Sequence, residues 1–106
     1  MEKYQGYQYT LPSPPTVRDK RYNHVFSVWR TGELTSLNRM FEIIPKSVVA
    51  DDLGMHYHSF VNKLNRPHLL NVNHLLKLQC LTGIEISALI GLAVADIKEK
   101  SRQQIK

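Results

Sequence analysis

The sequence predicts an all-α fold, a compact bundle of five or six short helices preceded by an extended N-terminal arm. From Asp19 onward, apolar residues recur at intervals of three and four, which is the period of a helix. No stretch alternates apolar and polar residues cleanly enough to predict a strand. Prolines between residues 12 and 15 forbid a helix there and favour an extended path. We therefore predict an arm, a helical domain and a basic tail, with the boundaries 1–18, 19–98 and 99–106.

Size and composition exclude several classes of protein. With 106 residues, 42% of them hydrophobic, the chain suits one small globular domain. Cys80 is the only cysteine, which excludes an intrachain disulfide and a zinc site built on two cysteines. The apolar runs are shorter than the about 20 residues of a membrane span, and the first residues lack the apolar core of a secretory signal. We therefore expect no membrane partner and a cytoplasmic location.

The charge of the chain favours nucleic acid as a partner, but only modestly. The net charge is +5, from 14 Lys and Arg against 9 Asp and Glu. A basic balance of this kind suits a polyanionic partner. Most of the excess lies in the first 32 residues and in the tail, so charge alone does not indicate a DNA-reading surface in the middle of the chain.

The arm carries tyrosines that interleave with glutamines, at Tyr4, Tyr7 and Tyr9. Three interpretations of this pattern stay open. The arm could be a mobile segment, as chain ends commonly are. It could instead pack on a partner subunit, or its tyrosines and Lys3 could touch nucleic acid.

The first predicted helix begins after Asp19, which is a suitable N-cap, and stops at Gly32. We leave open whether Trp29 of this helix lies in the core or at a subunit interface. The apolar face of the helix carries Tyr22, Val25, Phe26 and Trp29.

Two short helices joined by a tight turn are predicted between Lys46 and Arg66. Gly54 stands where a positive φ would reverse the chain, and Met55 would plug the turn. The small side chain of Ala50 lets the two helices cross closely. This pattern describes a helix-turn-helix. The predicted inner residues are Val49, Ala50 and Leu53 in the first helix, and Phe60, Val61 and Leu64 in the second.

Three further helices follow from the same period. One is short and ends at Pro45, one ends at Gly83, and one is the last helix of the chain. Cys80 would be a core residue of the second of these helices. The predicted caps are Thr35 or Ser36 for the first, and Asn71 or Asn73 for the second. The predicted inner residues are Leu37, Met40, Phe41 and Ile44; Val72, Leu75, Leu76 and Leu81; and Ile86, Leu89, Ile90, Val94 and Ile97.

The central residues resemble a known family. The run from Ile44 to Met55, followed by Phe60 and Leu64, resembles the helix-turn-helix of phage-repressor-like regulators, also called Cro-like or Xre-type. The likeness covers about residues 20–98. Within it, the run from residue 41 to residue 50 resembles more narrowly a group of small bacterial helix-turn-helix proteins. The resemblance implies an all-α fold that binds DNA through the second helix of the motif.

This chain departs from the family pattern at two positions. Lys63 stands where the family usually has an apolar residue, with Leu64 beside it. His56 stands where the recognition helix often opens with Ser, Thr or Asn. Both departures concern the register of the motif rather than its presence.

The resemblance implies that outward residues of the second helix enter the major groove. Asn62 could pair with adenine, Lys63 or Arg66 could donate to guanine or phosphate, and Tyr57 could touch a thymine methyl or a phosphate. The opposing interpretation is a merely solvated helix face. The start of the preceding helix suits a phosphate. The candidate DNA-binding residues are Lys46, Ser47, His56, Tyr57, His58, Ser59, Asn62, Lys63 and Arg66.

We expect neither an enzyme nor a metal site. His56 and His58 suit chelation on a strand, but on a helix two such side chains point apart. Asp51 and Asp52 are adjacent and are interpreted as solvated charges. The glycines are widely separated, so there is no Gly-rich phosphate loop.

The predicted function is sequence-specific binding of double-stranded DNA by a transcriptional regulator that acts by occupying an operator. We expect a homodimer on paired half-sites, with no cofactor and no small-molecule substrate. The final helix and the arm are the surfaces available for dimerisation. The alternative is a protein-interaction module on the same fold, such as an antitoxin-like protein or a phage adapter.

Overall fold

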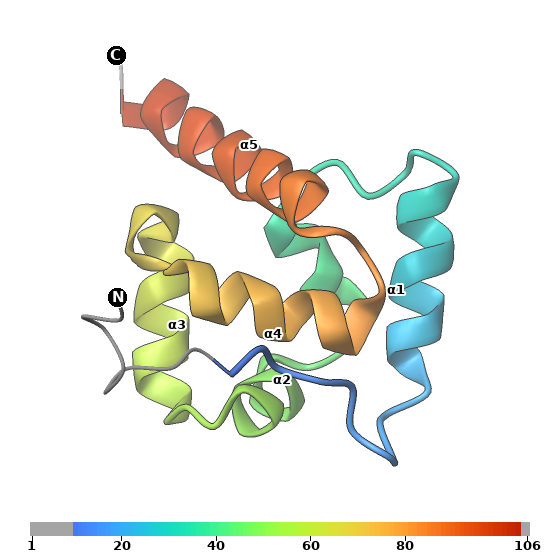
Figure 1. Cartoon of the computed structure of the whole chain (residues 1–106). Coiled ribbons are helices and arrows are strands. Elements are labelled where there is room, and N and C mark those ends of the chain that lie inside the picture. Colours follow the sequence, from blue (N-terminus) through green and yellow to red (C-terminus); the bar gives the residue numbers. More distant parts are fainter. Residues whose placement is uncertain (1–9, 105–106) are drawn as a thin grey trace, which may run out of the picture.

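The computed structural model describes residues 10–104, with side chains to residue 102, and this part of the chain is all-helical (Figure 1). It contains five α-helices and two short 3-10 helices, and no strand. The predicted fold class is therefore confirmed. The elements are α1 (Arg21–Arg30), η1 (Leu37–Glu42), α2 (Lys46–Leu53), α3 (Tyr57–Asn65), η2 (Pro67–Leu69), α4 (Val72–Thr82) and α5 (Ile86–Gln104).

The helix α4 lies in the middle of the molecule and contacts α1, α2 and α5 (Figure 1). The two helices α2 and α3 pack on each other, and η1 and η2 both pack on α5. Figure 1 shows α1 and α3 at opposite ends of α4. This arrangement holds α3 at the edge of the bundle, with one face toward the core and the other toward solvent.

Every helix contributes to one apolar core. Phe41 and Phe60 meet edge to face, with ring centroids 5.7 Å apart, and join η1 to α3. Trp29 is half-buried against the same core and stacks on Phe26 at 5.5 Å. The largest fully buried side chains are Tyr22, Phe60, Leu37, Met40, Ile44, Leu78, Ile84, Leu89, Val25, Val49 and Thr82.

The helix ends agree with most of the predicted caps. Asn71 caps α4: its Oδ1 accepts from the His74 backbone N–H at 2.8 Å, and His74 Nδ1 accepts from the Asn71 N–H at 3.3 Å. Burial lowers the pKa of His74, and so do nearby lysines, which keeps Nδ1 free to accept. The Asp19 carboxylate accepts from the Arg21 N–H at 2.9 Å, although α1 begins after Lys20.

Several predicted inner residues lie instead at the surface. Val72 in the first turn of α4 is 63% exposed. Along α5, Ile90, Val94 and Ile97 are 44%, 39% and 36% exposed. Both helices carry more apolar residues than one packed face can bury. In α5 the buried row therefore differs from the predicted one. The buried row of α5 consists of Leu89, Leu92, Ala93 and Asp96.

Two predicted elements differ in form from the expectation. The segment capped by Ser36 is a 3-10 helix, not an α-helix, and the Ser36 side chain makes no cap hydrogen bond. Its support comes from Asp96 of α5, whose Oδ2 accepts from the Asn38 N–H at 3.1 Å. Pro45, where the preceding helix was predicted to end, is the N-cap of α2. The helix α5 continues through residues 99–104, which begin the predicted basic tail.

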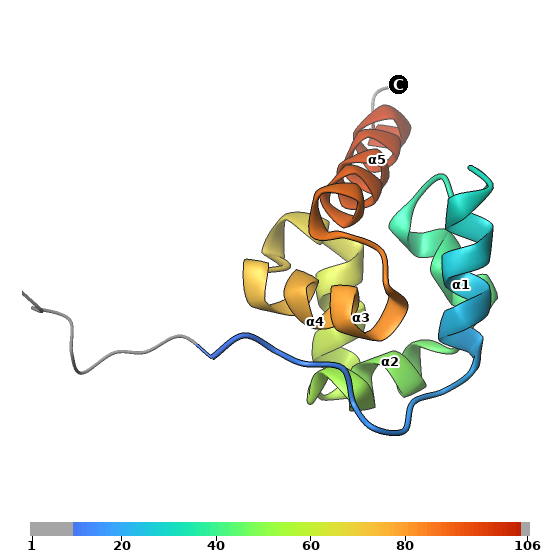
Figure 2. The same cartoon turned by 45° about the vertical axis from the view of Figure 1, so that its right-hand side comes forward.

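The described part of the arm, residues 10–18, is not helical and runs along α4 (Figure 2). The Cys80 thiol donates to the Pro12 carbonyl oxygen at 3.1 Å, so Cys80 is half-buried beneath the arm. The Arg18 guanidinium donates to the Leu81 carbonyl oxygen and, at 2.8 Å, to Asn23 Oδ1. The arm is thus attached to the domain at two points. The tyrosines at positions 4, 7 and 9 lie outside the described residues.

Within residues 10–104, no single helix is long and apolar enough to cross a membrane. The pair α4 and α5 reaches that length and composition only when the two are taken together, and they meet at 114°.

Candidate nucleic-acid interface

A tight turn joins α2 to α3. Gly54 has φ 72° and ψ 32°, a left-handed conformation that is unfavourable for other residues. Its N–H donates to the Asp51 carbonyl at 3.0 Å, and the Met55 N–H donates to the Ala50 carbonyl at 2.9 Å. This pair of bonds satisfies the end of α2 in the Schellman pattern. Because Ala50 is buried beside the turn, the two helices hold a fixed mutual orientation.

The inner face of α3 is fixed by two fully packed side chains. Phe60 and Leu64 are 0% and 3% exposed, and Val61 is half-buried. The helix begins after His56, whose backbone is extended and whose side chain makes no cap bond. It ends at Arg66, whose N–H donates to the carbonyls of Asn62 and Lys63. The α3 sequence contains no acidic residue, so its exposed face has no negative charge.

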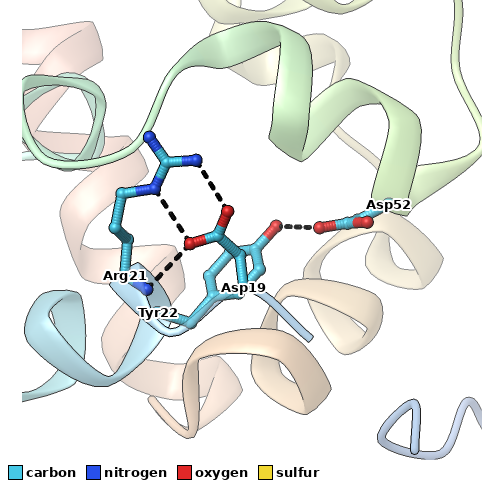
Figure 3. A network of polar contacts seen from close by, with 4 residues as sticks. All are labelled: Asp19, Arg21, Tyr22 and Asp52. Carbon is cyan, nitrogen blue, oxygen red and sulfur yellow. Dashed lines mark hydrogen bonds and ion pairs between the residues drawn. The ribbon is translucent and has the colours of Figure 1, made fainter. Parts of the chain in front are cut away.

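A buried tyrosine anchors α2 to α1. Tyr22 is fully buried in the first turn of α1, and its hydroxyl donates to Asp52 Oδ2 at 2.6 Å (Figure 3). Burial raises the pKa of Tyr22 well above its usual range, and the Asp52 carboxylate raises it further. Asp52 is exposed, as expected of a solvated charge, and its carboxylate also accepts the hydrogen bond from the tyrosine, which the sequence did not indicate. Only the tertiary structure brings these two residues together.

A second carboxylate lies in the same region. Asp19 forms a bidentate pair with the Arg21 guanidinium, with contacts of 2.9 and 2.6 Å (Figure 3). The Arg21 side chain, together with its backbone N–H, lowers the pKa of Asp19 to about 2. This pair fixes the start of α1 and thereby the position of the neighbouring Tyr22.

The helix α4 also contacts α2, at the C-terminal end of α2. The Lys77 ammonium donates to the Leu53 carbonyl oxygen at 3.4 Å, at the C-terminus of α2. A cation in this position is favourable for the helix dipole. The hairpin of α2 and α3 is therefore held from α1 and from α4.

The predicted site residues divide by exposure. Lys46 and Lys63 are half-buried, and Lys63 lies near His74, at the side of α3 that faces α4. Tyr57 is 47% exposed, and its ring packs against that of His58 at 5.6 Å. Lys46 and Ser47 lie in the first turn of α2. The exposed members are Ser47, His56, Tyr57, His58, Ser59, Asn62 and Arg66.

One residue was missed by sequence analysis. Asn65 is exposed and follows Asn62 by three positions, so both lie on the same side of α3 as His58. The spacing of residues 58, 62 and 65 contained this signal, because a helix places all three on one side. We define the outer face of α3 as His58, Ser59, Asn62 and Asn65.

Across residues 10–102, no three His, Cys, Asp or Glu side chains gather in a way that could hold a metal ion. The polar groups of the outer face of α3 are amides, a hydroxyl and an imidazole, which donate and accept hydrogen bonds. Comparison of the chain with protein-family models, with curated proteins and with solved structures gave no match.

Proposed function

We propose that α2 and α3 form a helix-turn-helix that binds double-stranded DNA, and that the protein is a transcriptional regulator. The observation that carries this proposal is the outer face of α3, which is exposed, polar and free of acidic residues. It stands on the rigid support of Phe60 and Leu64. An α-helix with its side chains is about 10–12 Å in diameter, which fits the about 12 Å width of the major groove.

In this proposal the outer face of α3 reads base edges. The amides of Asn62 and Asn65 can each pair with adenine through two hydrogen bonds. Tyr57 borders this face and packs on its His58. At the start of α2, Lys46 and Ser47 would contact a phosphate of the backbone, where the dipole of the helix favours an anion.

We further propose that the protein acts as a homodimer. A single helix of this length contacts only one half-site, and two copies would cover two half-sites about one helical turn apart. The exposed apolar residues Ile90, Val94 and Ile97 lie at i, i+4 and i+7 on α5 and form the surface for a second copy. We call this surface the α5 stripe.

A titration of duplex DNA at two salt concentrations tests the proposal. Asn62→Ala should weaken binding to a selected site by about tenfold, because a paired base loses its partner. Asn73→Ala is the matched control, since Asn73 is an exposed asparagine on α4, outside the outer face of α3. Salt-sensitive binding that Asn62→Ala weakens and Asn73→Ala leaves unchanged supports groove reading. Equal binding by all three proteins contradicts it.

One observation favours the alternative of a protein-interaction module. Leu11 of the arm and Val72 of α4 are 72% and 63% exposed, and they border a cavity of about 580 Å³ together with Leu76. A surface of this kind suits an apolar segment of a protein partner. Absence of salt-sensitive DNA binding would favour this function.

A further inference from the structure

The C-terminal end of α3 opens onto a groove that the sequence did not indicate. The groove lies between η2 and the end of α5, and its volume is about 400 Å³. Figure 1 shows α5 ending beside η2, on the side of the molecule where α3 lies. Residues about 35 positions apart in the chain therefore share its walls. The polar lining consists of Asn65, Arg66, His68, Lys100 and Ser101.

This lining has the chemistry of an anion site. Two of its side chains, Arg66 and Lys100, are cationic, and no Asp or Glu lines the groove. Within residues 10–102, side-chain ion pairs join Arg21 to Asp19, Arg39 to Glu42 inside η1, and Arg102 to Glu99 inside α5. Arg66 takes part in none of these three pairs. The Asn65 amide, the Ser101 hydroxyl and the His68 ring add groups that can donate hydrogen bonds.

Two carboxylates of α5, Asp96 and Glu99, stand within four residues of Lys100, but neither lines the groove. Asp96 is 5% exposed, and Lys100 partly offsets its negative charge. The Asp96 carboxylate is directed at η1, where it accepts from the Asn38 N–H. Lys100 is half-buried at the rim of the groove and remains one of its lining residues.

We propose that this groove binds a backbone phosphate of DNA. The proposal rests on the proposed function, because Asn65 belongs to the outer face of α3 and Arg66 follows it directly. A helix about 10–12 Å in diameter fills a groove about 12 Å wide, so residues that flank the helix lie near the sugar-phosphate strands. Lys46 and Ser47 would hold a phosphate near one end of the hairpin, and Arg66 with Lys100 would hold a phosphate beyond the other.

The test compares Arg66→Gln and Lys100→Gln with Lys98→Gln at several salt concentrations between about 50 and 200 mM. Lys98 is an exposed lysine of α5 that does not line the groove, so Lys98→Gln makes the same charge change outside the site. Each groove variant should lose about one phosphate contact. The slope of log K against log salt should then fall by about 0.9, and binding should weaken about fivefold near 0.15 M salt.

The loss should be equal for specific and random duplexes, because a phosphate contact carries no sequence information. Sedimentation of each variant verifies that the oligomeric state has not changed. An equal loss in all three variants would mean a general effect of net charge and would overturn the proposal. Unchanged binding in the groove variants, with Asn62→Ala still impaired, would overturn the phosphate site alone. Wild-type protein that does not bind DNA would overturn both the site and the proposed function.

Discussion

The two surfaces that the domain exposes most clearly differ in chemistry. The outer face of α3 is polar and contains no acidic residue, whereas the α5 stripe is a row of aliphatic side chains. Both helices are amphipathic and both pack one face into the same core. A polar face can form hydrogen bonds to a hydrated, charged partner. An apolar row stabilises a complex only when the contact removes its side chains from water. The difference in chemistry is the reason for proposing DNA as the partner of the first surface and a second subunit as the partner of the other.

The largest expected effect comes from removing the support behind α3. Phe60→Ala should lower the free energy of unfolding by about 3–5 kcal/mol, because a fully buried aromatic side chain leaves a cavity beneath the helix. Thermal or denaturant unfolding measures this loss. Tyr57→Ala is the control on the same helix, since Tyr57 is 47% exposed and its removal should have a much smaller effect. Equal losses for the two variants would mean that the inner face of α3 is not the one described.

The second prediction tests the α5 stripe. The double variant Ile90→Glu, Val94→Lys should raise the dissociation constant of the dimer by on the order of tenfold or more, because it places charge in an apolar contact. The new pair at i and i+4 favours the helix, so the monomer should keep its fold. Analytical ultracentrifugation gives the constant, and circular dichroism gives the helix content.

The matched control for the stripe is Val72→Glu, an apolar residue that is exposed on another helix. If this variant weakens the dimer and the double variant does not, the dimer forms through the arm and α4. A wild-type protein that is monomeric at all concentrations tested would contradict the proposal that the α5 stripe binds a second copy.

The smallest effect concerns the link between α1 and α2. Tyr22→Phe removes one hydrogen bond to an exposed carboxylate, and we expect a loss of about 1 kcal/mol in the free energy of unfolding at pH 7. Folding raises the pKa of Tyr22, so the folded protein keeps the phenolic proton that the unfolded chain releases near pH 10. Stability is therefore complete below about pH 10 and falls as the pH rises further.

Unfolding curves between pH 7 and 11 measure this dependence. The part of the alkaline decline that belongs to Tyr22 should be absent in Tyr22→Phe. If the wild-type protein and the variant declined equally above pH 10, Tyr22 would not be the group responsible.

The order and ends of the helices were largely predictable because they depend on local signals. Gly54 and Asn71 act within one turn of the chain, so a pattern of neighbours reveals them. Which row of α5 is buried depends instead on which side of the helix packs against η1 and η2, and these elements are distant in sequence. Ile90 and Leu89 are equally apolar, and only packing decides that Leu89 is buried. Periodicity cannot rank two adjacent rows when both are apolar.

The candidate site shows the same division. The residues of α3 could be named from the motif, since they follow one another on a single helix. The groove beside Arg66 could not, because Lys100 comes from a helix that begins 20 residues after Arg66. The bond between Tyr22 and Asp52 joins residues 30 positions apart and leaves no trace in local sequence.

The contact between Cys80 and Pro12 gives the arm a chemical reporter. The thiol lies beneath residues 10–18 and is the single cysteine of the chain. A reagent that reacts with thiols can therefore modify one position only, and that half-buried position becomes more accessible when the arm leaves α4. The rate of that reaction measures the local opening of the arm, separately from unfolding of the domain. Addition of DNA or of a protein partner would then reveal, through a change in this rate, whether the partner uses the arm.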